Sequence, residues 1–107
     1  MQTQTVVYVR VTPANYDLND KLSNETTLPD VNLKASWTIV TPHPGRFTSV
    51  TAEVTHPASQ NSDAFFKSVA AAVLKAVRAA AGSGGTVKAT GYQKADSMDV
   101  VELDLAA

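Results

Sequence analysis

The stretch that decides the fold is LKASWTIVTPHPGRFTSVTAEV, which occupies residues 33–54. It contains two segments in which polar and apolar side chains alternate, and between them lies a turn, residues 41–45, with two prolines and a glycine. Successive side chains of a β-strand point to opposite faces of a sheet, so the alternation predicts two strands. The turn residues between them predict a β-hairpin.

One face of this hairpin carries mainly hydroxyl groups. The side chains that alternate onto it are Lys34, Ser36, Thr38, Phe47, Ser49, Thr51 and Glu53. A hairpin register can set the polar positions of two strands side by side on one surface of the sheet. Such a surface suits contact with solvent, with a partner protein or with a polymer.

Length and composition indicate one domain over residues 1–107. A chain of 107 residues with 44% hydrophobic residues can bury a modest core. The net charge of −1 gives no bulk basic signal, so any nucleic-acid site would have to be local. The chain has no cysteine, which excludes disulfides and a cysteine zinc site. No apolar run reaches membrane-spanning length and no targeting segment is visible, so we expect a soluble protein with no membrane partner.

The content of charged residues is low. Only 18% of residues are charged, whereas roughly a quarter is usual for a soluble domain. A surface poor in charge favours coverage by copies of the same chain or by partners.

Outside the hairpin, the patterns predict three further strands and one long helix. The strands are residues 3–12, 86–92 and 98–105, and residues 13–32 form a long irregular connection with a short extended piece near 26–28. Residues 64–81 lack glycine and proline and predict a helix, with Ser62 as its N-cap and Gly82 at its end. The order predicts an α+β fold: a mostly antiparallel sheet of about five strands with one long α-helix packed across it.

The apolar stripe of the helix is wide for so small a sheet. Apolar surface left over after covering one sheet favours a dimer. The side chains expected at this dimer interface are Phe65, Phe66, Val69, Val73 and Val77.

The sequence does not predict an enzyme, a metal site or a cofactor. His43 and His56 both stand beside prolines at strand ends and are expected to be exposed turn residues without a catalytic or metal-binding partner. The glycine-rich stretch 82–85 follows a helix, which is the wrong end for holding phosphate. An acidic cluster near the C-terminus has the alternation of a solvated strand face; its members are Asp96, Asp99, Glu102 and Asp104.

The hydroxyl face leaves two interpretations open. Lys34 and Arg46 are candidates for phosphate contacts, and the hydroxyl groups can bond sugar or base edges of RNA; these are Ser36, Thr38, Ser49 and Thr51. Alternatively, serine and threonine simply make a good exposed sheet face.

Three stretches resemble the coat proteins of small single-stranded RNA bacteriophages, the levivirus type. They are residues 9–16, where a strand leads into a Pro-x-Asn-aromatic passage, the hairpin 33–54, and residues 61–63 before the helix. Within the hairpin, Lys34-Ala-Ser-Trp-Thr-Ile resembles the family's Lys-x-Thr-x-Ser strand, and Ser49-Val-Thr-Ala-Glu-Val resembles its Thr-x-Lys-x-Glu-Val strand.

The resemblance implies a coat protein that forms an interlocked dimer, with the helix of one copy against the sheet of the other. Dimers would assemble in the bacterial cytoplasm into the icosahedral shell of a virion around single-stranded RNA. The hydroxyl face would bind this RNA, with Arg46 as a nearby phosphate contact. The chain departs from the family by having fewer strands before the helix, by ending in strands, and by placing Thr51 where lysine is common. The alternative is a non-enzymatic structural or interaction domain that forms oligomers without nucleic acid.

Overall fold

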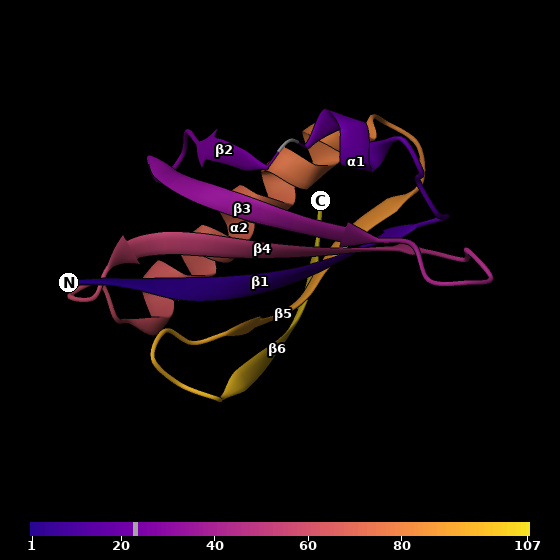
Figure 1. The fold of residues 1–107 in the computed structure, drawn as a ribbon. Helices are drawn as coiled ribbons and strands as arrows, with labels where there is room; N and C mark the ends of the chain where they lie inside the picture. The colour runs from indigo at the N-terminus through magenta and orange to yellow at the C-terminus, as the bar shows by residue number, and fades with distance from the viewer. Residues whose placement is uncertain (23) are drawn as a thin grey trace.

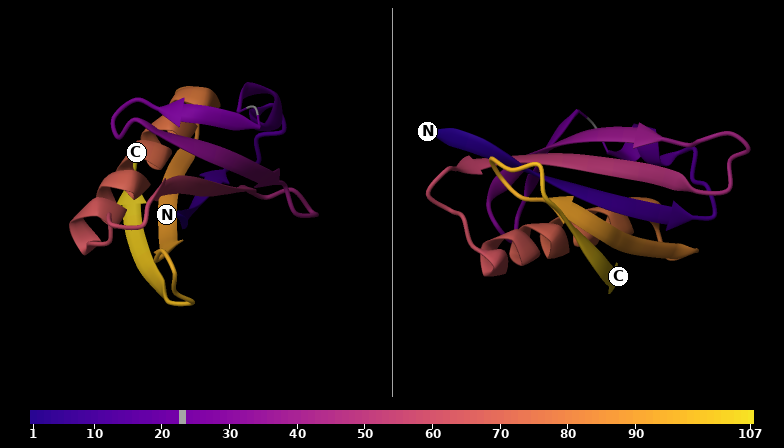
Figure 2. Two further views of the ribbon diagram at one scale, coloured as in Figure 1. Left: turned by 60° about the vertical axis from the view of Figure 1, so that its left-hand side comes forward. Right: turned by 90° about the horizontal axis from the view of Figure 1, so that it is seen from below.

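The computed structural model describes residues 1–22 and 24–107 and has one sheet of six strands. The strands are β1 (Gln2–Thr12), β2 (Glu25–Leu28), β3 (Leu33–Val40), β4 (Thr48–Pro57), β5 (Thr86–Gln93) and β6 (Val100–Ala106). The helices are α1 (Leu18–Lys21) and α2 (Asp63–Ala81). Figures 1 and 2 show α2 lying across a single face of the sheet.

The predicted α+β class is confirmed, with six antiparallel strands in place of about five. The strand order is β2-β3-β4-β1-β5-β6, and each neighbouring pair is antiparallel. The additional strand, β2, lies where the sequence predicts a short extended piece. Its four residues are too few to show a clear alternation, so the sequence predicts this strand only weakly.

The first strand of the chain lies in the interior of the sheet. β1 pairs with β4 on one side, from Gln2 opposite Pro57 to Val11 opposite Thr48, and with β5 on the other. Because both neighbours run antiparallel to β1, β4 and β5 point the same way, and α2 connects them. The helix therefore crosses from one side of β1 to the other.

Both ends of α2 are fixed by local contacts. The hydroxyl of Ser62 accepts a hydrogen bond of 3.1 Å from the backbone N–H of Phe65, so the predicted N-cap is confirmed. Gly82 ends the helix with a φ of 80°, which residues with a Cβ rarely adopt. The guanidinium of Arg78 donates to the carbonyls of Gly82 at 3.0 Å and of Gly84 at 2.7 Å. These bonds hold the glycine-rich loop against the last turn of the helix.

The core lies between α2 and the sheet. Phe66, Val69, Val73 and Val77 are at most 2% exposed, and burying each side chain contributes roughly 1.5–3 kcal/mol. Among the buried side chains of the sheet in the same core cluster are Val7, Val9, Val87, Ala89 and Tyr92.

The helix stripe predicted to form a dimer interface therefore packs on the chain's own sheet, and of its five residues only Phe65 is half-buried rather than buried. A dimer interface made from this stripe would need α2 to exchange sheets between two copies.

His56 is buried, so the prediction of an exposed turn residue is wrong. β4 continues through Pro57, and the alternation of Val54 and His56 directs both side chains toward α2. The imidazole Nδ1 donates to the carbonyl of Pro57 at 2.9 Å, and Nε2 lies 2.7 Å from the hydroxyl of Thr5. Its ring packs edge-on to Phe65, with 4.7 Å between centroids. His43 is exposed as expected.

The connection before β3 contains a helix that the sequence patterns did not predict. α1 spans one turn only, which is too short for an amphipathic period to appear. Leu18 of this helix is fully buried and Leu22, just after it, is 7% exposed. The connection is thus anchored to the core. Within the described part of the chain, neither helix is long and apolar enough to cross a membrane.

We predict that Val73→Asp abolishes folding. An unpaired carboxylate buried under α2 costs several kcal/mol, a large part of the roughly 5–15 kcal/mol that stabilises a typical domain. Ala71→Asp is the matched control, because Ala71 is exposed on the same helix. Circular dichroism during thermal unfolding should show a cooperative transition for Ala71→Asp and none for Val73→Asp. A normally folded Val73→Asp variant would contradict the observed packing of α2.

Candidate nucleic-acid interface

The candidate site is the sheet face that α2 leaves uncovered, here called the open face (Figure 2). The strand register arranges its side chains in rows that run across the sheet. Four rows are Thr27-Lys34-Thr55-Gln4, Glu25-Ser36-Glu53-Val6-Gln93, Thr38-Thr51-Tyr8-Gly91 and Val40-Ser49-Arg10-Lys88. The open face is therefore continuous from β2 to β5.

The hydroxyl groups predicted from the hairpin share this face. Thr38 of β3 lies directly opposite Thr51 of β4, with Ser36 and Ser49 in the adjacent rows. Ser36 and Thr38 are exposed, whereas Ser49 and Thr51 are half-buried. Their hydroxyls can donate and accept, so these four side chains offer uncharged hydrogen-bonding groups beside the carboxylate of Glu53, which lies opposite Ser36.

Tyr8 supplies an aromatic ring in the row of Thr38 and Thr51. It lies on β1 between Thr51 and Gly91, and its side chain is half-buried. Its hydroxyl is 3.5 Å from Oε1 of Gln93. An aromatic ring on a sheet surface is a platform on which an unpaired base can stack.

One end of the open face is basic. The guanidinium carbon of Arg10 lies 4.3 Å from the ring centroid of Phe47, a cation–π contact that fixes its position. Lys88 lies opposite Arg10 on β5, and its Nζ is 2.6 Å from a carboxylate oxygen of Asp104. Arg10 thus offers a charge that can reach a phosphate.

Lys34 and Arg46 lie at opposite ends of the hairpin. Lys34 is the second residue of β3 and Arg46 belongs to the turn beyond this strand, so strand geometry separates them by roughly 20 Å. Nζ of Lys34 lies 3.5 Å from a carboxylate oxygen of Glu25, an exposed ion pair. The two predicted phosphate contacts therefore do not form one site, and Arg46 is nearer to the Arg10 end.

The hairpin pattern did not reveal the contributions of β1 and β5. Tyr8 and Arg10 stand on the polar face of the predicted strand 3–12, and Lys88 belongs to the predicted strand 86–92. Gln93 lies just beyond that predicted strand, and it shares a face with Lys88 because the pairing of β1 with β5 shifts register between Tyr8 and Val9. The alternation of β1 is readable in the sequence, whereas the register shift opposite β5 is not. The pairing of β1 with β4 joins segments that are far apart in the sequence. Local sequence patterns do not predict such a pairing.

The carboxylates near the open face form local pairs. Within residues 1–22 and 24–107, no three histidine, aspartate or glutamate side chains come close enough to hold a metal ion. Of the acidic cluster, Asp96 accepts a hydrogen bond of 2.7 Å from the hydroxyl of Thr3, and Asp104 pairs with Lys88. These carboxylates have structural partners.

Comparison with models of protein families, with curated proteins and with solved structures finds no match for this chain. The resemblance to bacteriophage coat proteins accordingly stays a prediction from the residues quoted for it.

We predict that Lys34→Ala and Arg10→Ala each change the free energy of unfolding by less than about 1 kcal/mol, because exposed ion pairs and cation–π contacts contribute little. Urea unfolding followed by tryptophan fluorescence measures this. A loss well above that value would assign the side chain a structural role and remove it from the candidate interface.

Proposed function

We propose that this chain is the coat protein of a small single-stranded RNA bacteriophage: it dimerises, assembles into an icosahedral shell in the bacterial cytoplasm, and packages RNA against the open face. The observation that carries the proposal is the joining of the two hydroxyl strands on a broad sheet surface that the helix leaves free.

The open face carries side chains that can contact single-stranded RNA. Hydroxyls from β3 and β4 can bond sugars and base edges, Tyr8 can stack with a base, and Arg10 can hold a phosphate. Arg46 extends the basic end of the face. With so few cations, the affinity would be modest and sensitive to salt.

Self-association is supported by the edge strand β6 and the surface beside it. β6 ends the sheet with seven residues, and an edge strand offers unpaired backbone groups to another chain. Leu103 and Leu105 of β6 line hollows beside α2, and Leu105 is 40% exposed. A second copy that covers this region would bury apolar surface, which agrees with the low content of charged residues.

Electron microscopy of the protein expressed alone in bacteria, with the ultraviolet absorbance spectrum of the same sample, tests the proposal. Uniform closed particles with a nucleic-acid absorbance are expected. A chain that stays monomeric at high concentration would refute the coat function.

A pair of double variants tests the RNA surface. We predict that Arg10→Ala with Lys88→Ala, and likewise Lys34→Ala with Arg46→Ala, lowers the RNA content of particles without changing the fold, because each removes two cations. Lys88 and Lys34 are paired with carboxylates, so Arg10 and Arg46 should account for most of the loss. The control is Lys21→Ala, which removes an exposed charge from α1, outside the open face. The ratio of RNA to protein in purified particles is the measurement. Equal RNA content in the two double variants and the control would move the RNA site away from the open face.

The second candidate function is a structural or interaction domain that forms oligomers without nucleic acid. The observation that favours it is the acidic character of part of the open face: Glu25 neutralises Lys34, Asp104 neutralises Lys88, and Glu53 stands near the centre. A stable dimer that carries no RNA after expression in bacteria would support this function over the first.

A further inference from the structure

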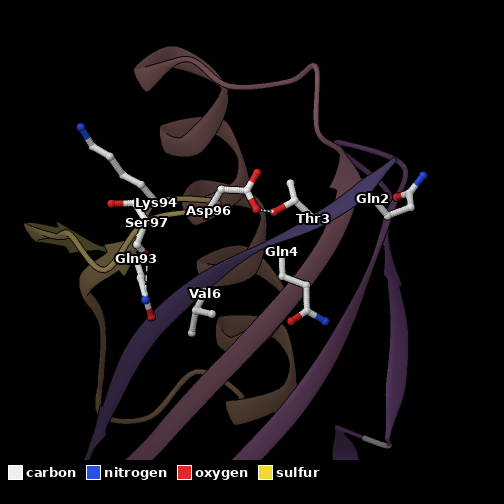
Figure 3. Close-up of a pocket in the computed structure, with 8 residues that line it drawn as sticks. All are labelled: Gln2, Thr3, Gln4, Val6, Gln93, Lys94, Asp96 and Ser97. Atoms are coloured by element: carbon white, nitrogen blue, oxygen red, sulfur yellow. Dashed lines mark hydrogen bonds between the residues drawn. The ribbon is translucent and has the colours of Figure 1, made fainter.

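A polar cleft of about 430 Å³ lies at the end of the open face opposite the basic end (Figure 3). Pairing between β1 and β5 begins at Val6, so the first residues of β1 lie beside the turn that follows β5. The cleft is lined by Gln2, Thr3, Gln4, Val6, Gln93, Lys94, Asp96 and Ser97.

The floor and walls of this cleft combine one apolar side chain with amides. Val6 lies directly opposite Gln93 on β5, and Gln4 lies two residues before Val6 on the same face of β1. Figure 3 shows Val6 between the side chains of Gln4 and Gln93. Nε2 of Gln93 donates to the carbonyl of Ser97 at 2.9 Å, which fixes the orientation of this amide.

The charges around the cleft disfavour a phosphate. Glu53 of β4 lies opposite Val6 on the other side from Gln93, and Asp96 lines the cleft directly. The one lysine of the lining, Lys94, has its Nζ 3.7 Å from a carboxylate oxygen of Asp63 at the start of α2. An uncharged ligand with hydrogen-bonding edges and a flat apolar face fits a cleft with an apolar floor, amides and the carboxylate of Asp96, next to which Glu53 adds a second carboxylate beside Val6.

We propose that the cleft binds one unpaired nucleobase that carries an exocyclic amino group. The base would lie over Val6, the amide of Gln4 or Gln93 would bond its ring edge, and the carboxylate of Glu53 would accept a hydrogen bond from the amino group. This inference rests on the proposed function. It adds a base-selective position to a surface whose hydroxyls and cations alone would bind RNA of any sequence.

The position of the cleft fits a bound strand that also reaches the rest of the open face. Tyr8 follows Val6 on the same face of β1, and Arg10 follows Tyr8. Strand geometry separates Val6 from Arg10 by roughly 13 Å, a distance that a few nucleotides of single-stranded RNA can span. A base over Val6, a second base on Tyr8 and a phosphate at Arg10 are therefore compatible with one strand.

Cytosine and uracil are the matched probes. At one ring position cytosine carries an amino group, whereas uracil carries a carbonyl oxygen. We expect an eight-nucleotide oligocytidine to bind the full-length chain, purified free of host RNA, about tenfold more tightly than oligouridine of the same length. Fluorescence anisotropy at one fixed salt concentration measures both affinities. In Glu53→Gln the preference should disappear, because an amide can pair with either base.

Two controls and a second variant complete the test. Glu25→Gln removes a carboxylate from the same row and should keep the preference for cytosine. Gln4→Leu should weaken oligocytidine binding, whereas Gln60→Leu, at an exposed glutamine before α2, should not.

The outcomes separate this inference from the proposed function. Equal affinities for the two oligonucleotides, or a preference that survives in Glu53→Gln, would overturn the inference and leave RNA binding by the open face standing. Failure of both oligonucleotides to bind, together with particles or dimers that lack RNA, would refute the proposed function and the inference with it.

Discussion

Packing of α2 on β1 and β5 is the interaction on which the rest of the structure depends. The buried stripe of the helix covers the middle of a six-stranded sheet, and the buried valines of β1, β4 and β5 alternate toward it. A strand that sends every second residue into this core must send the others to the opposite face. The polar character of the open face is thus the direct consequence of a helix that covers only one side.

Elements that depend on local periodicity were predictable from the sequence. The strands 3–12 and 86–92, the hairpin and the capped helix all repeat a pattern with a period of two or near 3.6 over many residues. The burial of His56 was missed because a proline follows it, although the same alternation continues through Val54 to that position. α1 escaped prediction because a single turn has no period.

Only the β3 and β4 part of the candidate interface could be predicted from local periodicity. The hydroxyls of β3 and β4 come from strands adjacent in sequence, so one turn brings them together. Tyr8 and Arg10 join them only because β1 pairs with β4 across about forty intervening residues, and Gln93 joins because β5 pairs with β1. The ion pair of Lys34 with Glu25 also depends on strand pairing, because β2 brings Glu25 beside β3. This carboxylate reduces the positive charge that Lys34 can present to a phosphate.

The interior position of β1 has a consequence for how the chain reaches its folded state. β1 needs one neighbour from residues 48–57 and another from residues 86–93, and both lie far along the chain from it. During synthesis β1 therefore stays unpaired until residues 48–57 have followed, and one of its edges stays open until residues 86–93 have followed. Pairings between such distant segments slow folding and expose strand edges to association.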